Sequence, residues 1–379
     1  MAGIYIHIPF CKQACHYCDF HFSTKMDKKE EMLSALCEEL KLRKGEFKDE
    51  VVETIYFGGG TPSILTSEQI GQLIAAVYEN YAVVQEPEIT LEANPDDLSA
   101  EKIRALSNSP VNRLSIGIQS FFEEDLRLMN RAHSANEAKT CLTEATTYFE
   151  NISIDLIYGM PNMSKNRWQK NLEEALSFKI PHISSYALTV EPKTALEKFI
   201  ATGKVPPLND EMAAAHYKQL LYTMEAHAYV PYEFSNFGKE GFFSKNNTAY
   251  WLGKKYLGIG PSAHSFDGKQ RGWNVSNNTK YLRAIAQQAL PMELEVLSLR
   301  DRYNEYVMTG LRTIWGVSLE RVRSVYGEEY YNYIVTASKK HLQEGLLSLE
   351  KETLLVTRKG KFLSDGIASD LFMLNLESC

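Results

Sequence analysis

The sequence predicts an α/β protein, in which a partial (β/α)6 barrel is followed by a smaller, mainly helical domain. Six short runs rich in β-branched and aromatic residues alternate with longer segments of helical periodicity. The runs recur about every 25 to 50 residues, which suits βα units joined by right-handed crossovers. Polar residues follow the ends of several runs, where parallel barrels carry their chemistry.

The barrel accounts for the first part of the chain. Its six predicted strands span residues 4–9, 53–58, 88–93, 113–118, 152–157 and 183–188. The stretches between them are long enough for a helix to return the chain across the sheet, so the strands are expected to be parallel. We assign residues 1–235 to this barrel.

Beyond the barrel the pattern changes twice. Glycines and aromatic residues replace helical periodicity in residues 236–298, which contain NNTAYW and GIGPSAH, so we expect a connecting module there. Residues 299–379 return to helical patterns, and LSLEKETLLVTRKG indicates a hairpin before a final helix. This order is typical of a winged-helix-like domain.

Composition excludes several classes of protein. The net charge of −7 and the absence of long like-charge blocks disfavour nucleic acid as a partner. No apolar run approaches the roughly 18 residues of a membrane span, which leaves only peripheral membrane contact open. Cys37, Cys141 and Cys379 are isolated, so a reducing compartment and a cytoplasmic location are expected. The sequence leaves the oligomeric state open.

The other three cysteines lie close together, directly after the first predicted strand. Cys11, Cys15 and Cys18 fall within eight positions. The same spacing occurs on the apolar face of a short helix, but Pro9 and His16 suit such a helix poorly. The cluster therefore favours a metal site.

The donor set leaves two kinds of metal centre open. Three thiolates cannot complete a 4Fe–4S cluster, so one iron would remain free for a small ligand. Zinc is the competitor, because His16 or His21 could complete a tetrahedral set with the cysteines.

Glycines and polar side chains follow the other strands. GGGTPS, residues 58–63, holds more glycine than a turn requires, and a backbone without Cβ atoms can approach a ligand closely. Glu92 and Asn94 end the third strand, Gln119 ends the fourth, Arg131 follows it, and Asp155 lies in the fifth. Each alone could be a cap or a solvated group, but their shared rim favours a binding site.

These motifs carry a resemblance along nearly the whole chain. CKQACHYC matches the pattern CxxxCxxC, and it is followed in order by YFGGGTPS, LEANP, IGIQSF, DLIYGMP, YEFSNF and YLGIGPSAHSF. Together they resemble the radical S-adenosylmethionine (SAM) superfamily, in the branch around oxygen-independent coproporphyrinogen III oxidase.

The resemblance implies cofactors and the residues that bind them. Cys11, Cys15 and Cys18 would hold a 4Fe–4S cluster whose open iron binds the amino and carboxylate groups of SAM. The positions that match SAM contacts are Tyr5, Tyr17 through its backbone, Gly59, Gly60, Thr61, Glu92, Gln119, Arg131, Asp155, Ala187 and His264. The implied chemistry is one-electron reduction of the sulfonium, giving methionine and a 5′-deoxyadenosyl radical. Whether SAM is cleaved stays open.

Two departures separate the chain from the oxidase. The oxidase pattern continues to a further cysteine, where this chain has Phe20, and the oxidase carries an extension before its first cluster cysteine, where this chain has ten residues. Both favour the haem chaperones (HemW-like proteins), which the resemblance implies deliver haem to apo-haemoproteins. Coproporphyrinogen III oxidase activity is therefore not expected. It remains the main alternative, followed by another radical SAM enzyme.

The candidate haem region departs from its relatives. Haem chaperones of this kind typically carry HNxxYW, whose histidine is the natural candidate for an iron ligand. Here Asn246 replaces that histidine, whereas Asn247, Tyr250 and Trp251 are retained. An amide ligates iron poorly, so haem binding is expected to be weaker or differently ligated, and Asn246→His to strengthen it.

Overall fold

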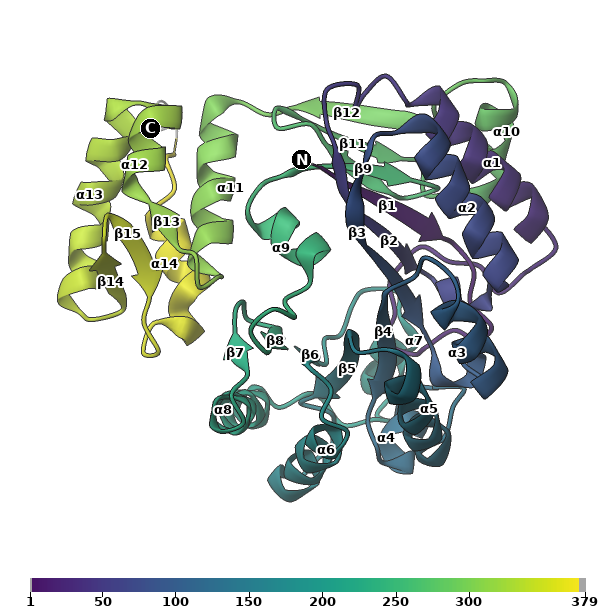
Figure 1. The fold of residues 1–379 in the computed structure, drawn as a ribbon. Helices are drawn as coiled ribbons and strands as arrows, with labels where there is room; N and C mark the ends of the chain where they lie inside the picture. Colours follow the sequence, from purple (N-terminus) through teal and green to yellow (C-terminus); the bar gives the residue numbers. More distant parts are fainter. Residues whose placement is uncertain (1, 375–379) are drawn as a thin grey trace.

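The computed structural model describes residues 2–374, and Cys379 lies outside them. Its central feature is a sheet in which six neighbouring strands are parallel (Figure 1). These strands are β1 (Ala2–Ile8), β2 (Val52–Gly59), β3 (Val83–Ala93), β4 (Arg113–Gln119), β5 (Ile152–Tyr158) and β6 (His182–Ala187). Every predicted strand overlaps one of them, which confirms the partial barrel.

Helices connect these strands and cover the outer face of the sheet (Figure 1). They are α1 (Lys29–Leu42), α2 (Ser67–Asn80), α3 (Ala100–Ser107), α4 (Glu123–Leu128), α5 (Ala135–Tyr148), α6 (Lys165–Ser177), α7 (Ala195–Ala201) and α8 (Asp210–Ala226). Capping boxes start α2 at Thr66 and α5 at Ser134. Alternate side chains of β1, including Ile4 and Ile6, are fully buried in the core. Because these side chains pack in the core on one face of the sheet, the side chains that alternate with them point into the barrel.

That inner face is unusually polar, and it positions the site. Tyr5, Glu92, Ser115, Asp155 and Ser184 come from five different strands and line an internal cavity. Aliphatic side chains usually fill the interior of a parallel barrel. Here the polar interior provides hydrogen-bonding groups for a ligand.

Residues 236–298 do not form a separate connecting module, because they extend the sheet at both edges. Within residues 2–374 the strand order is β12-β11-β10-β9-β1-β2-β3-β4-β5-β6-β8-β7. The added elements are β7 (Val230–Pro231), β8 (Asn236–Gly238), α9 (Lys245–Trp251), β9 (Lys255–Ile259), β10 (His264–Phe266), β11 (Gln270–Asn274), α10 (Asn278–Ala286) and β12 (Met292–Val296). Strand β9 pairs with β1 in parallel, so the segment continues the same sheet.

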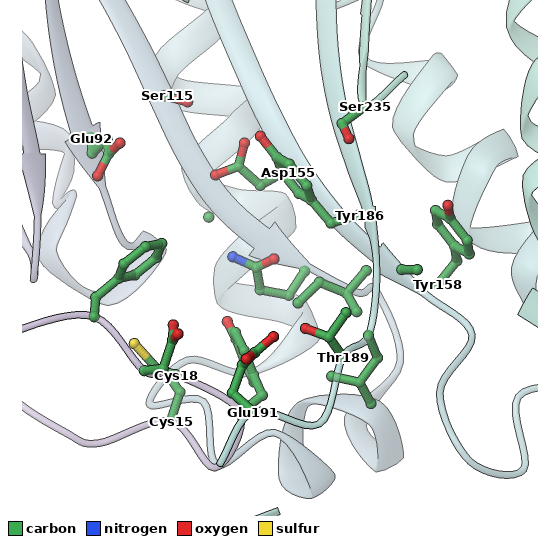
Figure 2. Close-up of a pocket in the computed structure, with 18 of the residues that line it drawn as sticks. Cys15, Cys18, Glu92, Ser115, Asp155, Tyr158, Tyr186, Thr189, Glu191 and Ser235 are labelled. Atoms are coloured by element: carbon green, nitrogen blue, oxygen red, sulfur yellow. The ribbon is translucent and has the colours of Figure 1, made fainter. Parts of the chain in front are cut away.

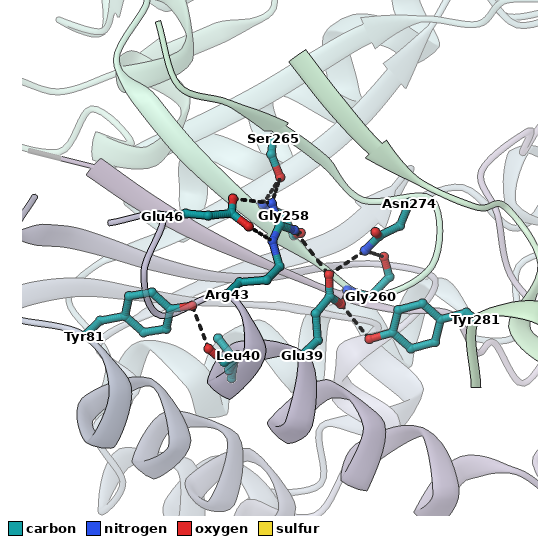
Figure 3. A network of polar contacts seen from close by, with 10 residues as sticks. All are labelled: Glu39, Leu40, Arg43, Glu46, Tyr81, Gly258, Gly260, Ser265, Asn274 and Tyr281. Atoms are coloured by element: carbon teal, nitrogen blue, oxygen red, sulfur yellow. Dashed lines mark hydrogen bonds and ion pairs between the residues drawn. The ribbon is translucent and has the colours of Figure 1, made fainter. Parts of the chain in front are cut away.

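A buried ion pair on α1 holds one of these edges (Figure 3). Arg43 Nη1 lies 3.2 Å from Glu39 Oε1 and donates to the carbonyl of Gly258 at 2.7 Å. Glu39 Oε2 accepts from the backbone of Gly260 at 2.7 Å and from the hydroxyl of Tyr281 at 2.6 Å. The two charges thus bridge α1 to the loop at the end of β9 and to α10.

The C-terminal part is a separate unit with its own core (Figure 1). Its elements are α11 (Leu299–Leu311), β13 (Val317–Ser318), α12 (Leu319–Arg321), α13 (Glu328–Gln343), β14 (Leu347–Glu350), β15 (Thr353–Val356) and α14 (Ser364–Asp370). Four helices around a sheet with a β14–β15 hairpin agree with the predicted winged-helix-like fold. In the described part of the chain, no helix is both long and apolar enough to cross a bilayer.

Candidate functional site

A cavity of about 860 Å³ opens at the carboxyl ends of the parallel strands, between the barrel and the C-terminal unit. Figure 2 shows Glu92 and Asp155 projecting from the strands into the space beside the loop that carries Cys15 and Cys18. The volume suits a small-molecule ligand. Twelve residues predicted from the sequence line it: Cys11, Cys15, Cys18, Tyr17, Gly59, Gly60, Thr61, Glu92, Gln119, Arg131, Asp155 and Ala187.

The cysteine loop is held in place by backbone hydrogen bonds at both ends and in the middle. The amide of Cys11 donates to the carbonyl of Ser23 at 3.0 Å, and the amide of His16 donates to the carbonyl of Met129 at 3.0 Å. The amide of Leu196, in α7, donates to the carbonyl of His16 at 2.8 Å. These bonds tie the loop to the segment after α4 and to α7.

A polar chain joins two of the cysteines. Thr61 Oγ1 donates to Cys11 Sγ at 3.2 Å and accepts from Asn94 Nδ2 at 3.3 Å. Asn94 Oδ1 in turn accepts from Arg131 Nη2 at 2.6 Å, and Arg131 Nη1 donates to Cys15 Sγ at 3.4 Å. Donors directed at sulfur stabilise thiolate charge and tune an iron–sulfur cluster.

The donor set fits a 4Fe–4S cluster with one open iron. All three thiols line one wall of the cavity, and burial raises the pKa of Cys11 to about 11 and that of Cys18 to about 12. Thiols in this state need a metal to become thiolates. Iron at this wall would face the cavity, where a further ligand has room.

The two histidines near the loop are engaged elsewhere. His16 Nδ1 lies 2.9 Å from the carbonyl of Leu128, and His21 Nε2 lies 2.7 Å from Asn278 Oδ1. Across residues 2–374, no three His, Cys, Asp or Glu side chains converge closely enough to hold a single metal ion. This arrangement disfavours zinc.

The glycines are required by the cysteine loop itself. A Cβ at Gly60 would lie 2.6 Å from the carbonyl oxygen of Phe10 and 2.8 Å from that of Ile8. Gly59 has φ +105°, and its Cβ would lie 2.5 Å from the His7 ring. These glycines, predicted to allow close approach of a ligand, also allow the end of β2 to pass against β1 and the start of the cysteine loop.

Two carboxylates in the cavity are poised to change charge. Burial raises the pKa of Glu92 to about 7 and that of Asp155 to about 6. Glu92 Oε1 accepts from Tyr56 at 2.7 Å. Perturbed carboxylates in a cavity mark a functional site, and both face the space available to a cationic ligand.

Gln119 marks the end of β4 with a strained backbone. Its φ is +65°, in the left-handed region that residues other than glycine rarely adopt, and its side chain is buried at the cavity wall. Strain of this kind persists only where the surrounding structure imposes it.

Two predicted SAM residues lie outside the main cavity. Tyr5 faces a smaller cavity deeper in the barrel. His264 begins β10, is exposed, and has its ring 6.1 Å from that of Trp273. Neither is brought to the cysteine loop.

The candidate haem region also faces inward. Asn246, Asn247 and Tyr250 of α9 line the smaller cavity, of about 230 Å³. Asn246 is only 4% exposed, and its Oδ1 accepts from Thr54 at 2.9 Å. Trp251 ends α9 and does not reach this cavity. The segment cannot meet a large planar ligand unless the barrel opens.

Sequence reasoning missed several cavity residues. Asn94 was placed at the rim but given no contact, although it joins Thr61 to Arg131. Tyr186 follows the inward alternation of β6 and could have been found. Arg312 and Lys361 come from the C-terminal unit, whose position over the barrel no local pattern reveals.

Comparison with known proteins agrees with this geometry. Residues 5–175 match the model of the radical SAM superfamily, and residues 297–363 match that of the HemN C-terminal domain. Coproporphyrinogen III oxidase HemN from Escherichia coli, a radical SAM enzyme, has the same fold, with a TM-score of 0.85 at 22% identity over 98% of this chain and 90% of that one. Fold and cysteine loop thus define a radical SAM protein.

Curated relatives narrow the class. Heme chaperone HemW of Bacillus subtilis is 34% identical over 97% of this chain and 98% of its own length. Heme chaperone HemW of Lactococcus lactis is 33% identical over 96% of this chain and 95% of its own length. The chain belongs to the HemW family of radical SAM proteins.

Proposed function

We propose that this protein is a haem chaperone, which holds a 4Fe–4S cluster and SAM in the main cavity and passes haem to apo-haemoproteins. The observation that carries the proposal is the shared cavity: three cysteines and nine further predicted residues line it in a chain of the HemW family. Haem enters the proposal because these relatives are named heme chaperones. A cytoplasmic location belongs to the same proposal, because the cysteine thiols must stay reduced.

Different residues would bind the cluster and SAM. Cys11, Cys15 and Cys18 would ligate the cluster, with hydrogen bonds from Thr61 and Arg131 tuning the sulfurs. When bound, the cluster supplies one electron to the SAM sulfonium.

Polar groups of the barrel interior would hold the organic part of SAM. Glu92 and Asp155 offer carboxylates to its ammonium and hydroxyl groups, and Gln119 offers an amide. Since Glu92 and Asp155 are buried with raised pKa values, a cationic ligand would favour their ionised forms.

The oxidase alternative is disfavoured at Phe20. This residue lines the main cavity and is 69% exposed, at the position where the oxidase resemblance calls for a further cysteine. An aromatic ring there adds apolar surface for a ligand and supplies no thiol.

The test is anaerobic reconstitution followed by three separate assays. We expect about four iron and four sulfide per chain, a SAM-induced change in the electron paramagnetic resonance spectrum of the reduced cluster, and stable haem binding read by the Soret band. Cys15→Ala should abolish the cluster, whereas Cys37→Ala on α1 should retain it.

The outcomes separate the candidates. Full iron content in Cys15→Ala would contradict the cluster assignment. Repeated conversion of coproporphyrinogen III to protoporphyrinogen IX would establish the oxidase instead, and transfer of bound haem to an apo-haemoprotein would support the chaperone.

A further inference from the structure

The C-terminal unit forms one wall of the main cavity. Arg312 follows α11, and Lys361 and Phe362 belong to the 3-10 turn Lys361–Leu363, and all three line the same cavity as the cluster cysteines. Across from them lie Tyr217 of α8 and Phe234 of the segment before β8. The cavity therefore has an outer part that the cluster and SAM residues do not provide.

Two cations stand in this outer part. The side chain of Lys361 is half-buried and makes no hydrogen bond or ion pair with any residue between 2 and 374, and the carboxylates of Glu225 and Glu233 act on it only at longer range. Arg312 Nη1 donates to Asp365 Oδ1 at 2.7 Å, and its guanidinium lies 5.1 Å from the centre of the Phe234 ring. Asp365 is exposed, so an incoming carboxylate can share or replace this contact.

Aromatic rings line the cavity beside the cations. Tyr158 stacks on Tyr217 at 6.1 Å between ring centres, and Phe362 meets Tyr217 edge-on at 5.5 Å. Phe362 is 56% exposed, and the hydroxyl of Tyr217 is buried without a partner among the described residues. A planar ligand would cover the exposed ring of Phe362.

Acidic and basic side chains lie in different parts of the cavity. Its other acids lie with the cysteine loop and its neighbours, at Asp19 and Glu191, or inside the barrel, at Glu92 and Asp155. Lys361 and Arg312 are contributed by the C-terminal unit. An amphipathic anion would therefore direct its carboxylates toward that unit.

We propose that the outer part of the main cavity is a porphyrin-binding site, in which Lys361 and Arg312 bind the carboxylates and the exposed ring of Phe362 packs against the porphyrin. This rests on the proposed haem-binding function and specifies its location. The main cavity, of about 860 Å³, is more than three times the volume of the cavity beside Asn246, of about 230 Å³, which falls below the usual size of a ligand pocket.

The lining explains how such a ligand can be given up again. None of the described residues around the main cavity is a histidine or methionine. The proposed contacts hold the porphyrin by its periphery and use neither of these two side-chain types as an iron ligand.

The experiment is a haem titration of the cluster-loaded, SAM-bound protein, compared with titration of haem dimethyl ester in the same detergent. Esterification removes the carboxylate charges and leaves ring and iron unchanged. The variants are Lys361→Gln, Arg312→Gln and Lys361→Arg, and the matched control is Lys339→Gln on the exposed side of α13. A tenfold change in affinity is what one charge-assisted hydrogen bond contributes.

We expect the wild type to bind haem about tenfold more tightly than its dimethyl ester. Lys361→Gln should lose most of that preference while its affinity for the ester is unchanged, and Lys361→Arg should restore it. Arg312→Gln should lose part of it, and Lys339→Gln none. Asn246→His should leave haem affinity unchanged, because that side chain faces the smaller cavity.

Contrary results are distinguishable. Equal weakening toward both ligands, or no preference in the wild type, would overturn the carboxylate site while leaving haem binding intact. Tighter binding by Asn246→His would move the site to α9. No haem binding by the wild type would overturn the proposed function itself and this site with it.

Discussion

Thr61 donates a hydrogen bond to Cys11 Sγ, and this contact should influence the cluster without being needed to hold it. A donor to sulfur stabilises the reduced, more negative cluster. We predict that Thr61→Val retains full iron content but has a more negative reduction potential, whereas Thr143→Val, exposed on α5, is unchanged. An anaerobic redox titration measures both, and an unaltered potential in Thr61→Val would mean that the contact does not act on the cluster.

Glu92 should make the protein less stable as the pH rises. Its pKa is raised from 4.5 to about 7 by burial, so the folded state keeps a proton that the unfolded state releases. The contribution is favourable below about pH 4.5 and is lost as the pH rises toward 7. Glu92→Gln cannot ionise and escapes this loss. Between pH 5 and pH 8, the difference in unfolding free energy between Glu92→Gln and the wild type should therefore shift in favour of the variant by on the order of 2 kcal/mol.

Urea unfolding at several pH values checks this prediction. Glu86→Gln, exposed on β3, is the control and should follow the wild type at every pH. A difference between Glu92→Gln and the wild type that does not vary with pH would contradict the raised pKa.

Two glycines, Gly60 and Gly71, differ in the space available for an added Cβ atom. A Cβ at Gly60 would press on backbone atoms of Ile8 and Phe10, which cannot move aside, whereas a Cβ at Gly71 in α2 would meet nothing within 4 Å. Gly60→Ala should destabilise the protein by roughly 1–3 kcal/mol and lower its iron content. Gly71→Ala should stabilise it by about 0.5–1 kcal/mol. Thermal unfolding and iron analysis test the pair, and similar effects of the two changes would refute the steric explanation.

At the level of elements, α1 holds the β9 to β11 edge through its buried ion pair. In Glu39→Gln, Arg43 keeps only its ion pair with the partly exposed Glu46, and the buried donors of Gly260, Asn274 and Tyr281 lose a charged acceptor, so the substitution should cost on the order of 3 kcal/mol of unfolding free energy. Glu31→Gln, exposed on α1, should cost less than about 0.5 kcal/mol. Denaturant titration gives both values, and a small loss in Glu39→Gln would show that this network contributes little to stability.

The sequence predicted the barrel strands better than the edges. Runs such as those in β1 and β4 are long and rich in β-branched residues, so local pattern identifies them. Strands β7, β8 and β10 have two or three residues each and exist only because a sheet edge is there to pair with. That is why residues 236–298 looked like a connector.

At the scale of the whole molecule, the two cores should open separately. Leu114 and Ile154 belong to the barrel core, and Val307 and Leu354 to that of the C-terminal unit. Val307→Ala should speed hydrogen exchange in α11 and α13 by about tenfold to a hundredfold and leave β4 and β5 unchanged. Hydrogen-exchange mass spectrometry resolves the two regions, and parallel loss of protection in both would reveal a single cooperative unit.

The site was predictable where it depends on strand ends and not where it depends on docking. Thr61, Glu92 and Asp155 could be found because parallel strands bring their carboxyl ends to one rim. Lys361 could not, since its place in the cavity depends on how two separately folded units meet. One contact that fixes this arrangement is the hydrogen bond from the amide of Ile314 to the carbonyl of Tyr232, at 3.0 Å.

The position of β1 between β2 and β9 has a consequence for synthesis on the ribosome. β1 leaves the ribosome early, but its second neighbour, Lys255–Ile259, follows about 250 residues later. Until then one edge of β1 has no partner strand, and an unpaired apolar edge invites association with other nascent chains. The barrel therefore has high contact order and is expected to close late and slowly, so that insertion of iron and sulfide into the cysteine loop would follow translation instead of accompanying it.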